Sequence, residues 1–201
     1  NSTGWEWNSD NKADGWTASV DGVEKTPAVS GGVIAVDMTK AKTIEFVSPA
    51  TTIKAFHSPF LELDIRMNDA LGFATNYNFD DIYVYWQTSG DTDFSESKMV
   101  KQSDFATLGG VVTSNYMKHL YFPMYMHPAW GRVNGKNGNT VTKIKIVVRA
   151  KQDAELTGSI KMNYVRGNYD TRHTNNGELL LRAGKLHYEF TGKADVLADN
   201  L

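Results

Sequence analysis

Histidine and carboxyl side chains are the groups in this sequence that could transfer protons or hold a metal ion. The five histidines are scattered without metal-ligand spacing: His57, His119, His127, His173 and His187. Neither the H-E-x-x-H nor the G-x-S-x-G pattern occurs. Glycoside hydrolysis needs two carboxyl groups with separated pKa values, but the adjacent Asp80 and Asp81 resemble a surface pair at a strand start. The sequence therefore predicts that this chain alone is not catalytic.

An acidic stretch at residues 91–96 has part of the pattern of a calcium-binding loop. Such a loop needs glycine at its sixth position and glutamate at its twelfth. Here Glu96 occupies the sixth position and Gln102 the twelfth, so we expect a solvated turn. The chain contains no cysteine, which excludes disulfides, thiolate metal sites and cysteine nucleophiles.

Aromatic rings, at 11% of the residues, are the other groups here that could bind a ligand. Sugars stack their apolar C–H faces on such rings, while polar side chains bind the hydroxyl groups. The rings considered for this role are Tyr83, Tyr85, Trp86, Tyr121, Tyr125 and Trp130, whereas Trp5, Trp7 and Trp16 are assigned to the core or to strand ends. Alternation puts Tyr83 and Tyr85 on the opposite strand face from Trp86, and one face must be core. Large aromatic rings in a β-sandwich are usually packed in its core, but Trp130 follows Pro128 in a loop-like stretch and is the better candidate for an exposed ring.

Most of the chain consists of short runs that are either apolar throughout or alternate between apolar and polar residues. Turn signals separate these runs, which must position the groups named above. In residues 60–67, Leu61 and Leu63 alternate with Glu62 and Asp64, and this period of two predicts a half-buried strand. Similar runs predict strands at 32–38, 42–47, 81–87, 116–122, 140–149 and 159–165. No amphipathic helix pattern separates them, which favours an all-β antiparallel sandwich or barrel over a parallel sheet.

The pattern changes after Gly167. Apolar residues in 176–190 recur at a period of about 3.6 residues, and a second short run at 196–201 could also be helical. Residues 1–167 are therefore expected to form the β domain, and residues 168–201 a helical segment.

Charge and length limit the possible partners. The 201 residues carry 21 basic and 23 acidic side chains, a formal net charge of −2, which argues against nucleic acid or another polyanion. No stretch approaches the roughly 20 apolar residues of a membrane span. The first residues show no leader sequence, so either the protein is cytoplasmic or the chain begins after a removed export segment.

Several stretches occur together in an order typical of one family. They are WEWNSD (5–10), GWTA (15–18), PFLELDIRM (59–67), VYWQT (84–88), DFSESK (93–98), PAWG (128–131), TKIKI (142–146) and GSIKMNYVR (158–166). In this order they resemble galactose-binding-like, jelly-roll carbohydrate-binding domains of bacterial polysaccharide-degrading proteins. The resemblance implies a jelly-roll sandwich in a secreted, periplasmic or cell-surface protein. Similar domains often hold a calcium between the first and last strands, which corresponds to Glu6 and Asn163 here. The asparagine replaces a common aspartate, and because this loss of charge weakens the site, calcium could bind there but is not expected.

The tail resembles a different family. Residues 169–176 and 188–197 are similar to the entry and first helix-turn-helix of an (α/α)-barrel glycosidase. If this holds, the chain ends where the catalytic domain begins, without the catalytic acids of the barrel.

Together these resemblances imply a non-catalytic carbohydrate-binding or accessory module of a glycoside hydrolase. It would bind polysaccharide or oligosaccharide through Trp130, Trp86, Tyr85, Tyr83 and Tyr125, and it would require no cofactor. A first alternative is the N-terminal part of an (α/α)-barrel glycosidase, in which the sandwich braces or completes the active site. A second is a structural module that binds protein.

Overall fold

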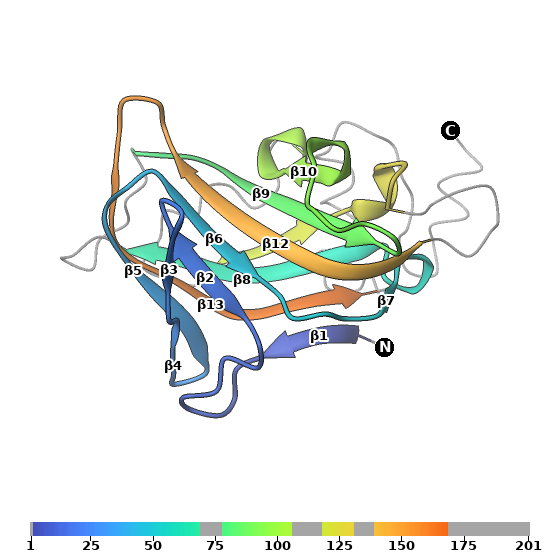
Figure 1. The fold of residues 1–201 in the computed structure, drawn as a ribbon, viewed down its shortest axis with the longest axis horizontal. Coiled ribbons are helices and arrows are strands. Elements are labelled where there is room, and N and C mark those ends of the chain that lie inside the picture. The colour runs from blue at the N-terminus through green and yellow to red at the C-terminus, as the bar shows by residue number, and fades with distance from the viewer. Residues whose placement is uncertain (1, 69–77, 106–117, 131–138, 169–201) are drawn as a thin grey trace, which may run out of the picture.

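The computed structural model describes residues 2–68, 78–105, 118–130 and 139–168, which form two antiparallel sheets packed face to face (Figure 1). The first, called the β8 sheet, has the order β11-β8-β13-β5-β4, with β1 also paired to β13. The second, called the β9 sheet, has the order β10-β9-β12-β6-β2-β3, with β7 paired to β12.

The β8 sheet consists of β1 (Ser2–Glu6), β4 (Ala28–Ser30), β5 (Val33–Ala41), β8 (Phe60–Asn68), β11 (Lys118–Phe122) and β13 (Leu156–Asn168). The β9 sheet consists of β2 (Thr17–Val20), β3 (Val23–Lys25), β6 (Thr43–Val47), β7 (Ile53–Lys54), β9 (Phe79–Thr88), β10 (Met99–Lys101) and β12 (Thr140–Ala150). Short 3-10 helices occupy connections: η1 (Ala55–His57), η2 (Glu96–Lys98), η3 (Gln102–Phe105) and η4 (Met124–Met126).

Successive strands repeatedly change sheets. The chain passes from β5 to β6, from β8 to β9, and then through β11, β12 and β13, moving to the opposite sheet at each of these steps. Such crossings between two open sheets produce the jelly-roll sandwich. The predicted all-β antiparallel sandwich is confirmed, and the barrel alternative is not what the described strands form.

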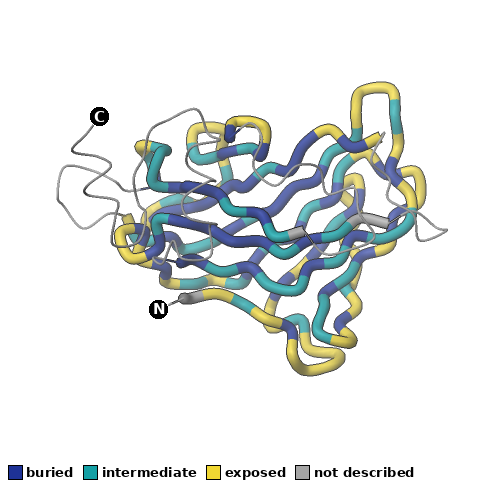
Figure 2. Tube along the Cα trace, turned by 180° about the vertical axis from the view of Figure 1, so that it is seen from behind, coloured by how far each residue is buried: buried dark blue, intermediate teal, exposed yellow. Residues whose placement is uncertain are grey.

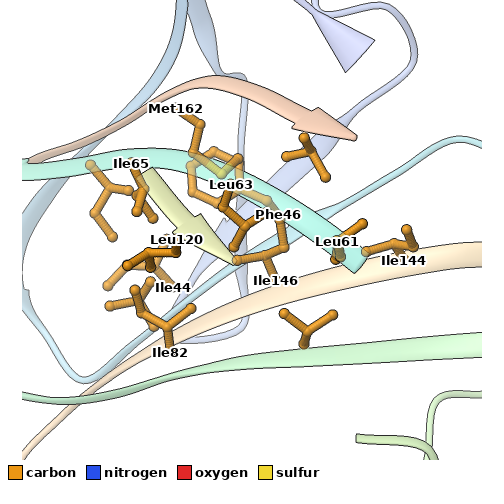
Figure 3. Packing of buried hydrophobic residues seen from close by; sticks show 14 of the residues in the cluster. Ile44, Phe46, Leu61, Leu63, Ile65, Ile82, Leu120, Ile144, Ile146 and Met162 are labelled. Carbon is orange, nitrogen blue, oxygen red and sulfur yellow. The ribbon is translucent and has the colours of Figure 1, made fainter. Parts of the chain in front are cut away.

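Alternating apolar residues explain why these strands face one another. In β12, Ile144, Ile146 and Val148 are fully buried, and in β8 Leu61 and Leu63 are as well. Figure 3 shows that such side chains, from strands of both sheets, meet in one layer between them. In Figure 2 buried and less buried residues alternate along the strands, as a period of two requires.

The expected helices at 176–201 and the tail resemblance at 169–197 lie outside the described residues. The β domain was expected to end at residue 167, and β13 ends at Asn168. In the described part of the chain no helix is long and apolar enough to cross a membrane.

Candidate functional site

Trp86 and Trp130, two of the predicted ligand-binding rings, lie inside the sandwich. Both are fully buried, and their rings meet edge to face with centroids 5.4 Å apart. The Trp130 indole N–H donates to the carbonyl of Ser58 at 2.9 Å, and that of Trp86 to the carbonyl of Ala129 at 3.3 Å. The prediction that Trp130 is exposed is wrong, because its ring anchors the loop against Trp86. A fully buried ring offers a sugar no face to stack on.

Tyr83 and Tyr85 lie on the outer face of the β9 sheet, with ring centroids 6.5 Å apart. Cationic side chains cover both rings: the Arg149 guanidinium lies 4.2 Å above Tyr83, and Lys145 Nζ lies 4.6 Å above Tyr85. Only 4% of Tyr85 is exposed. Its hydroxyl donates to Glu96 at 2.9 Å and accepts from Arg149 at 3.1 Å. One face of each of these two rings is therefore covered by a cation, and Tyr83 is half-buried while Tyr85 is buried.

Tyr125 lies apart from those rings, in η4. Its half-buried ring contacts that of Phe60 at the start of β8, with centroids 5.6 Å apart. Its backbone N–H donates to the carbonyl of Pro59 at 3.1 Å. The five predicted ring residues are thus divided among the core, the outer face of the β9 sheet and the region beside β8.

Glu6 and Asn163, the predicted calcium ligands, each contact other protein groups. The Glu6 carboxylate lies 3.4 Å from Arg166 Nη1, and the Asn163 amide donates to Asp64 at 3.3 Å. Among the residues that the structure describes, no group of three or more His, Asp or Glu side chains could hold a metal ion. The calcium site remains a prediction.

A cluster of polar and aromatic side chains occupies the outer face of the β8 sheet, on the side away from the core. It is called the Glu62 cluster and consists of Glu62, His119, Tyr121, Tyr164 and Arg166. Strand register brings these residues together. Tyr121 of β11 lies opposite Glu62 of β8, which lies opposite Arg166 of β13. In the next outward row, His119 and Tyr164 lie on either side of Asp64.

Glu62 is the buried centre of the cluster, with none of its side chain exposed. Its carboxylate accepts hydrogen bonds from Arg166 Nε at 2.7 Å and from the Asn168 amide at 2.9 Å, and His119 Nε2 lies 3.4 Å away. Burial by itself raises the pKa of this carboxyl. The close approach of His119 Nε2, the hydrogen bonds from Asn168 and Arg166, and the positive charge of Arg166 outweigh burial and lower the pKa of Glu62 to about 2.

The aromatic members of the cluster form a ledge of planar groups beside Glu62. The rings of His119 and Tyr121 lie 4.3 Å apart at a tilt of 31°, and Tyr164 meets His119 edge to face at 5.3 Å. The Arg166 guanidinium lies 4.0 Å above the Tyr164 ring. His119, Tyr121, Tyr164 and Arg166 are all half-buried, so each also has exposed surface.

The two tyrosines of the ledge remain hydrogen-bond donors at neutral pH. Burial raises the pKa of both phenols, and the neighbouring carboxylates add to the rise: Glu62 for Tyr121, and Asp64 most strongly for Tyr164. The protonated Tyr121 hydroxyl lies 3.3 Å from His119 Nδ1. Rings, phenols, an imidazole and a guanidinium are therefore exposed together around a fixed carboxylate.

This arrangement suits binding better than acid catalysis. A carboxyl whose pKa is about 2 stays ionised at neutral pH, so Glu62 cannot protonate a leaving group. Instead, the buried Glu62 carboxylate holds the Arg166 guanidinium and the His119 imidazole in position. Planar apolar surface next to oriented donors and acceptors is what recognition of a polyhydroxylated ring requires.

Sequence reasoning named Tyr121 as a ring candidate but missed the other members of the cluster. The alternation of 60–67 did place Glu62 and Asp64 on the polar side of their strand. Two further outward aromatic or histidine positions, at 119 and 164, lie in other predicted strands. Strand order was the missing information, because β8, β11 and β13 are far apart in sequence and adjacent only in the sheet.

Three solved structures are similar to this chain to different extents. A non-crystalline-cellulose-specific module, CBM28, superimposes with a TM-score of 0.54 at 10% identity, covering 79% of this chain and 90% of that module. The xylan-binding module CBM15 gives a TM-score of 0.42 at 12% identity, covering 83% of this chain and 94% of that module. The Endo-D glycoside hydrolase domain of Streptococcus pneumoniae R6 gives 0.44 at 10% identity, covering 84% of this chain and 22% of that one.

No protein-family model matches the chain, and no curated protein matches it in sequence. At 10% identity, the similarity to the CBM28 module establishes a common β-sandwich fold.

Proposed function

We propose that this chain is a carbohydrate-binding module and that the Glu62 cluster is its binding surface. The observation that carries the proposal is the ledge of half-exposed planar groups beside a buried, fully hydrogen-bonded carboxylate. The shared fold with a module specific for non-crystalline cellulose supports the same proposal.

A sugar ring would lie with its C–H face against Tyr121 or Tyr164. The Arg166 guanidinium, the His119 ring and the two phenol hydroxyls would then bind hydroxyl groups at its edge. Glu62 would act as a positioning residue, because it holds both Arg166 and His119 from beneath. Preorganised groups bind a ligand with a smaller loss of conformational entropy.

The module would belong to a larger carbohydrate-active protein that is secreted, periplasmic or at the cell surface. A catalytic domain in the same protein would be its other partner, and polysaccharide or oligosaccharide its ligand. These points extend the resemblances of the sequence to known families and are part of the proposal.

Calorimetric titration against neutral and acidic plant and host oligosaccharides tests this proposal. We expect saturable binding to at least one glycan, weakened about tenfold or more by Tyr121→Ala or Tyr164→Ala. Tyr83→Ala is the matched control, because it removes a half-exposed tyrosine from the outer face of the other sheet.

Two results would overturn the proposal. One is the absence of binding across the panel by a folded protein. The other is binding that Tyr83→Ala abolishes and the two cluster variants leave intact, which would move the site to the β9 sheet. Circular dichroism and urea unfolding of each variant separate lost binding from lost folding.

A further inference from the structure

Asp64 occupies the next outward position after Glu62 on β8, within the row of residues that carries two rings of the ledge. In the strand register it lies between His119 of β11 and Tyr164 of β13, and Glu6 of β1 lies beyond Tyr164. The side chains of Asp64, His119 and Tyr164 are all half-buried. Directly opposite residues of a sheet have β-carbons about 5 Å apart. A sugar ring on this part of the ledge would therefore have hydroxyl groups within reach of the Asp64 carboxylate.

The two carboxylates on this face of β8 differ in how they are satisfied. An ionised carboxyl group has two oxygens that together offer about four acceptor positions. Glu62 is fully buried and accepts hydrogen bonds from Arg166 and Asn168, so it offers a ligand no surface. Asp64 is half-buried, and in the part of the chain that the structure describes its one hydrogen bond comes from the Asn163 amide at 3.3 Å. Asp64 therefore keeps acceptor capacity for donors that come from outside the protein.

An irregularity in β13 lies opposite Asp64. The register of β13 against β8 shifts between Met162 and Tyr164, so that Asn163 is an extra residue in the strand. Such β-bulges redirect side chains and are over-represented next to active sites. Here the bulge turns two half-buried side chains toward the same carboxylate: the Asn163 amide, which donates to it, and the Tyr164 ring.

A carboxylate at this position favours sugars without a charge of their own. Arg166, the permanent cation of the ledge, is already engaged by Glu62 at 2.7 Å. Arg66 and Lys161 form the next outward row, about 7 Å further along β8. A carboxylate or sulfate on the sugar unit beside Asp64 would be repelled at close range, whereas the hydroxyl groups of that unit can donate to it.

We infer that Asp64 accepts hydrogen bonds from two adjacent hydroxyl groups of one sugar unit, and that it restricts the ligand to uncharged glycans with a free vicinal diol. The inference rests on the proposed function and names the ligand class of the same site. The rings of the ledge would hold a sugar by its apolar face, and Asp64 would distinguish one sugar from another by its hydroxyl groups. Hydrogen bonds to an ionised acceptor are about twice as strong as those between neutral groups, which suits this role.

Ligands that differ in the diol or in charge test the inference by calorimetry on the full chain. Cellohexaose, xylohexaose and a galactan-derived hexasaccharide are each compared with the form methylated at both hydroxyls of the diol, and with oligogalacturonate. We expect at least one free hexasaccharide to bind about tenfold more tightly than its methylated form and than oligogalacturonate. Asp64→Asn should reduce the affinity for the free form about tenfold and leave that for the methylated form nearly unchanged. Asp37→Asn is the matched control, because Asp37 is an exposed aspartate on β5 of the same sheet.

The outcomes separate this inference from the proposed function. An equal loss on methylation in the wild type and in Asp64→Asn, or tighter binding of oligogalacturonate, overturns the role of Asp64 and leaves glycan binding in place. Binding that a chelator abolishes overturns it as well, because a metal ion would then hold the hydroxyl groups. No binding of any glycan by the folded wild type overturns both.

A second variant keeps the test decisive if Asp64→Asn does not fold. Asn163→Ala leaves the Asp64 carboxylate in place but removes the amide that orients it. The preference for the free diol should then fall severalfold, without the complete loss expected for Asp64→Asn. Circular dichroism and urea unfolding establish that each variant is folded. An unchanged preference in a folded Asn163→Ala variant would contradict the proposed orientation of Asp64.

Discussion

Replacement of Glu62 by glutamine should remove a large part of the protein's acid sensitivity. The carboxyl has a pKa of about 2 in the folded chain, against an ordinary value of 4.5. Each pH unit of such a difference corresponds to about 1.4 kcal/mol, so the ionised carboxylate contributes about 3 kcal/mol to the free energy of unfolding.

The direction of the pH dependence of stability follows from the lowered pKa of Glu62. The contribution is complete above the unfolded-state value of 4.5 and is lost as the pH falls toward about 2, where the folded carboxyl is protonated. Between about pH 6 and about pH 3 the loss amounts to about 2 kcal/mol. Glutamine keeps the shape and an acceptor oxygen for Arg166 but does not titrate, so the variant should lack this part of the pH dependence.

Urea unfolding followed by tryptophan fluorescence, repeated across that pH range, measures the effect. Trp7, Trp86 and Trp130 are fully buried and should report loss of the core. Glu24→Gln serves as the control, because Glu24 is exposed on β3 and its removal measures the general effect of deleting one carboxylate. Parallel pH curves for the wild type and Glu62→Gln, with equal m-values, would refute the assignment of a stabilising, ionised Glu62.

Two further variants test the packing of the sandwich. Gly4→Ala should lower the free energy of unfolding by about 1–3 kcal/mol, because a β-carbon there would overlap the carbonyl of Val165 and the backbone of Arg166; an unchanged urea midpoint would contradict this close approach of β1 to β13. Trp130→Ala should cost about 3–5 kcal/mol, because it empties a fully buried site and removes the donor to Ser58. A small loss, as for an exposed ring, would show that Trp130 is not part of the core.

Alternation and turn signals were sufficient to predict an all-β antiparallel sandwich. In β8, Leu61 and Leu63 face the core while Glu62 and Asp64 face outward, as a period of two requires. The absence of helical periodicity between the strands disfavoured a parallel sheet. Such patterns are local, because burying one side of a strand constrains every second residue of that strand.

Local sequence patterns did not determine which aromatic rings are exposed. Trp130 follows a proline in a loop-like stretch, yet it is fully buried against Trp86. Whether a loop residue turns inward depends on the space left by distant residues, which no local pattern records. Here the carbonyl of Ser58, far away in sequence, accepts the indole hydrogen bond that holds the ring inside.

Only the tertiary structure assembled the candidate site. Residue types along the chain determined that Glu62 points away from the core, but not that Arg166, His119 and Asn168 surround it. Those partners come from β11 and β13, the two strands adjacent to β8 in the sheet. In the sequence, Arg166 and Asn168 lie 104 and 106 residues from Glu62. The lowered pKa of Glu62 follows from that assembly. Burial by itself raises this pKa, but the donors around the carboxylate lower it by a larger amount. Sequence periodicity fixes which face a side chain occupies, and strand order, set by packing of the whole sandwich, decides which side chains it meets there.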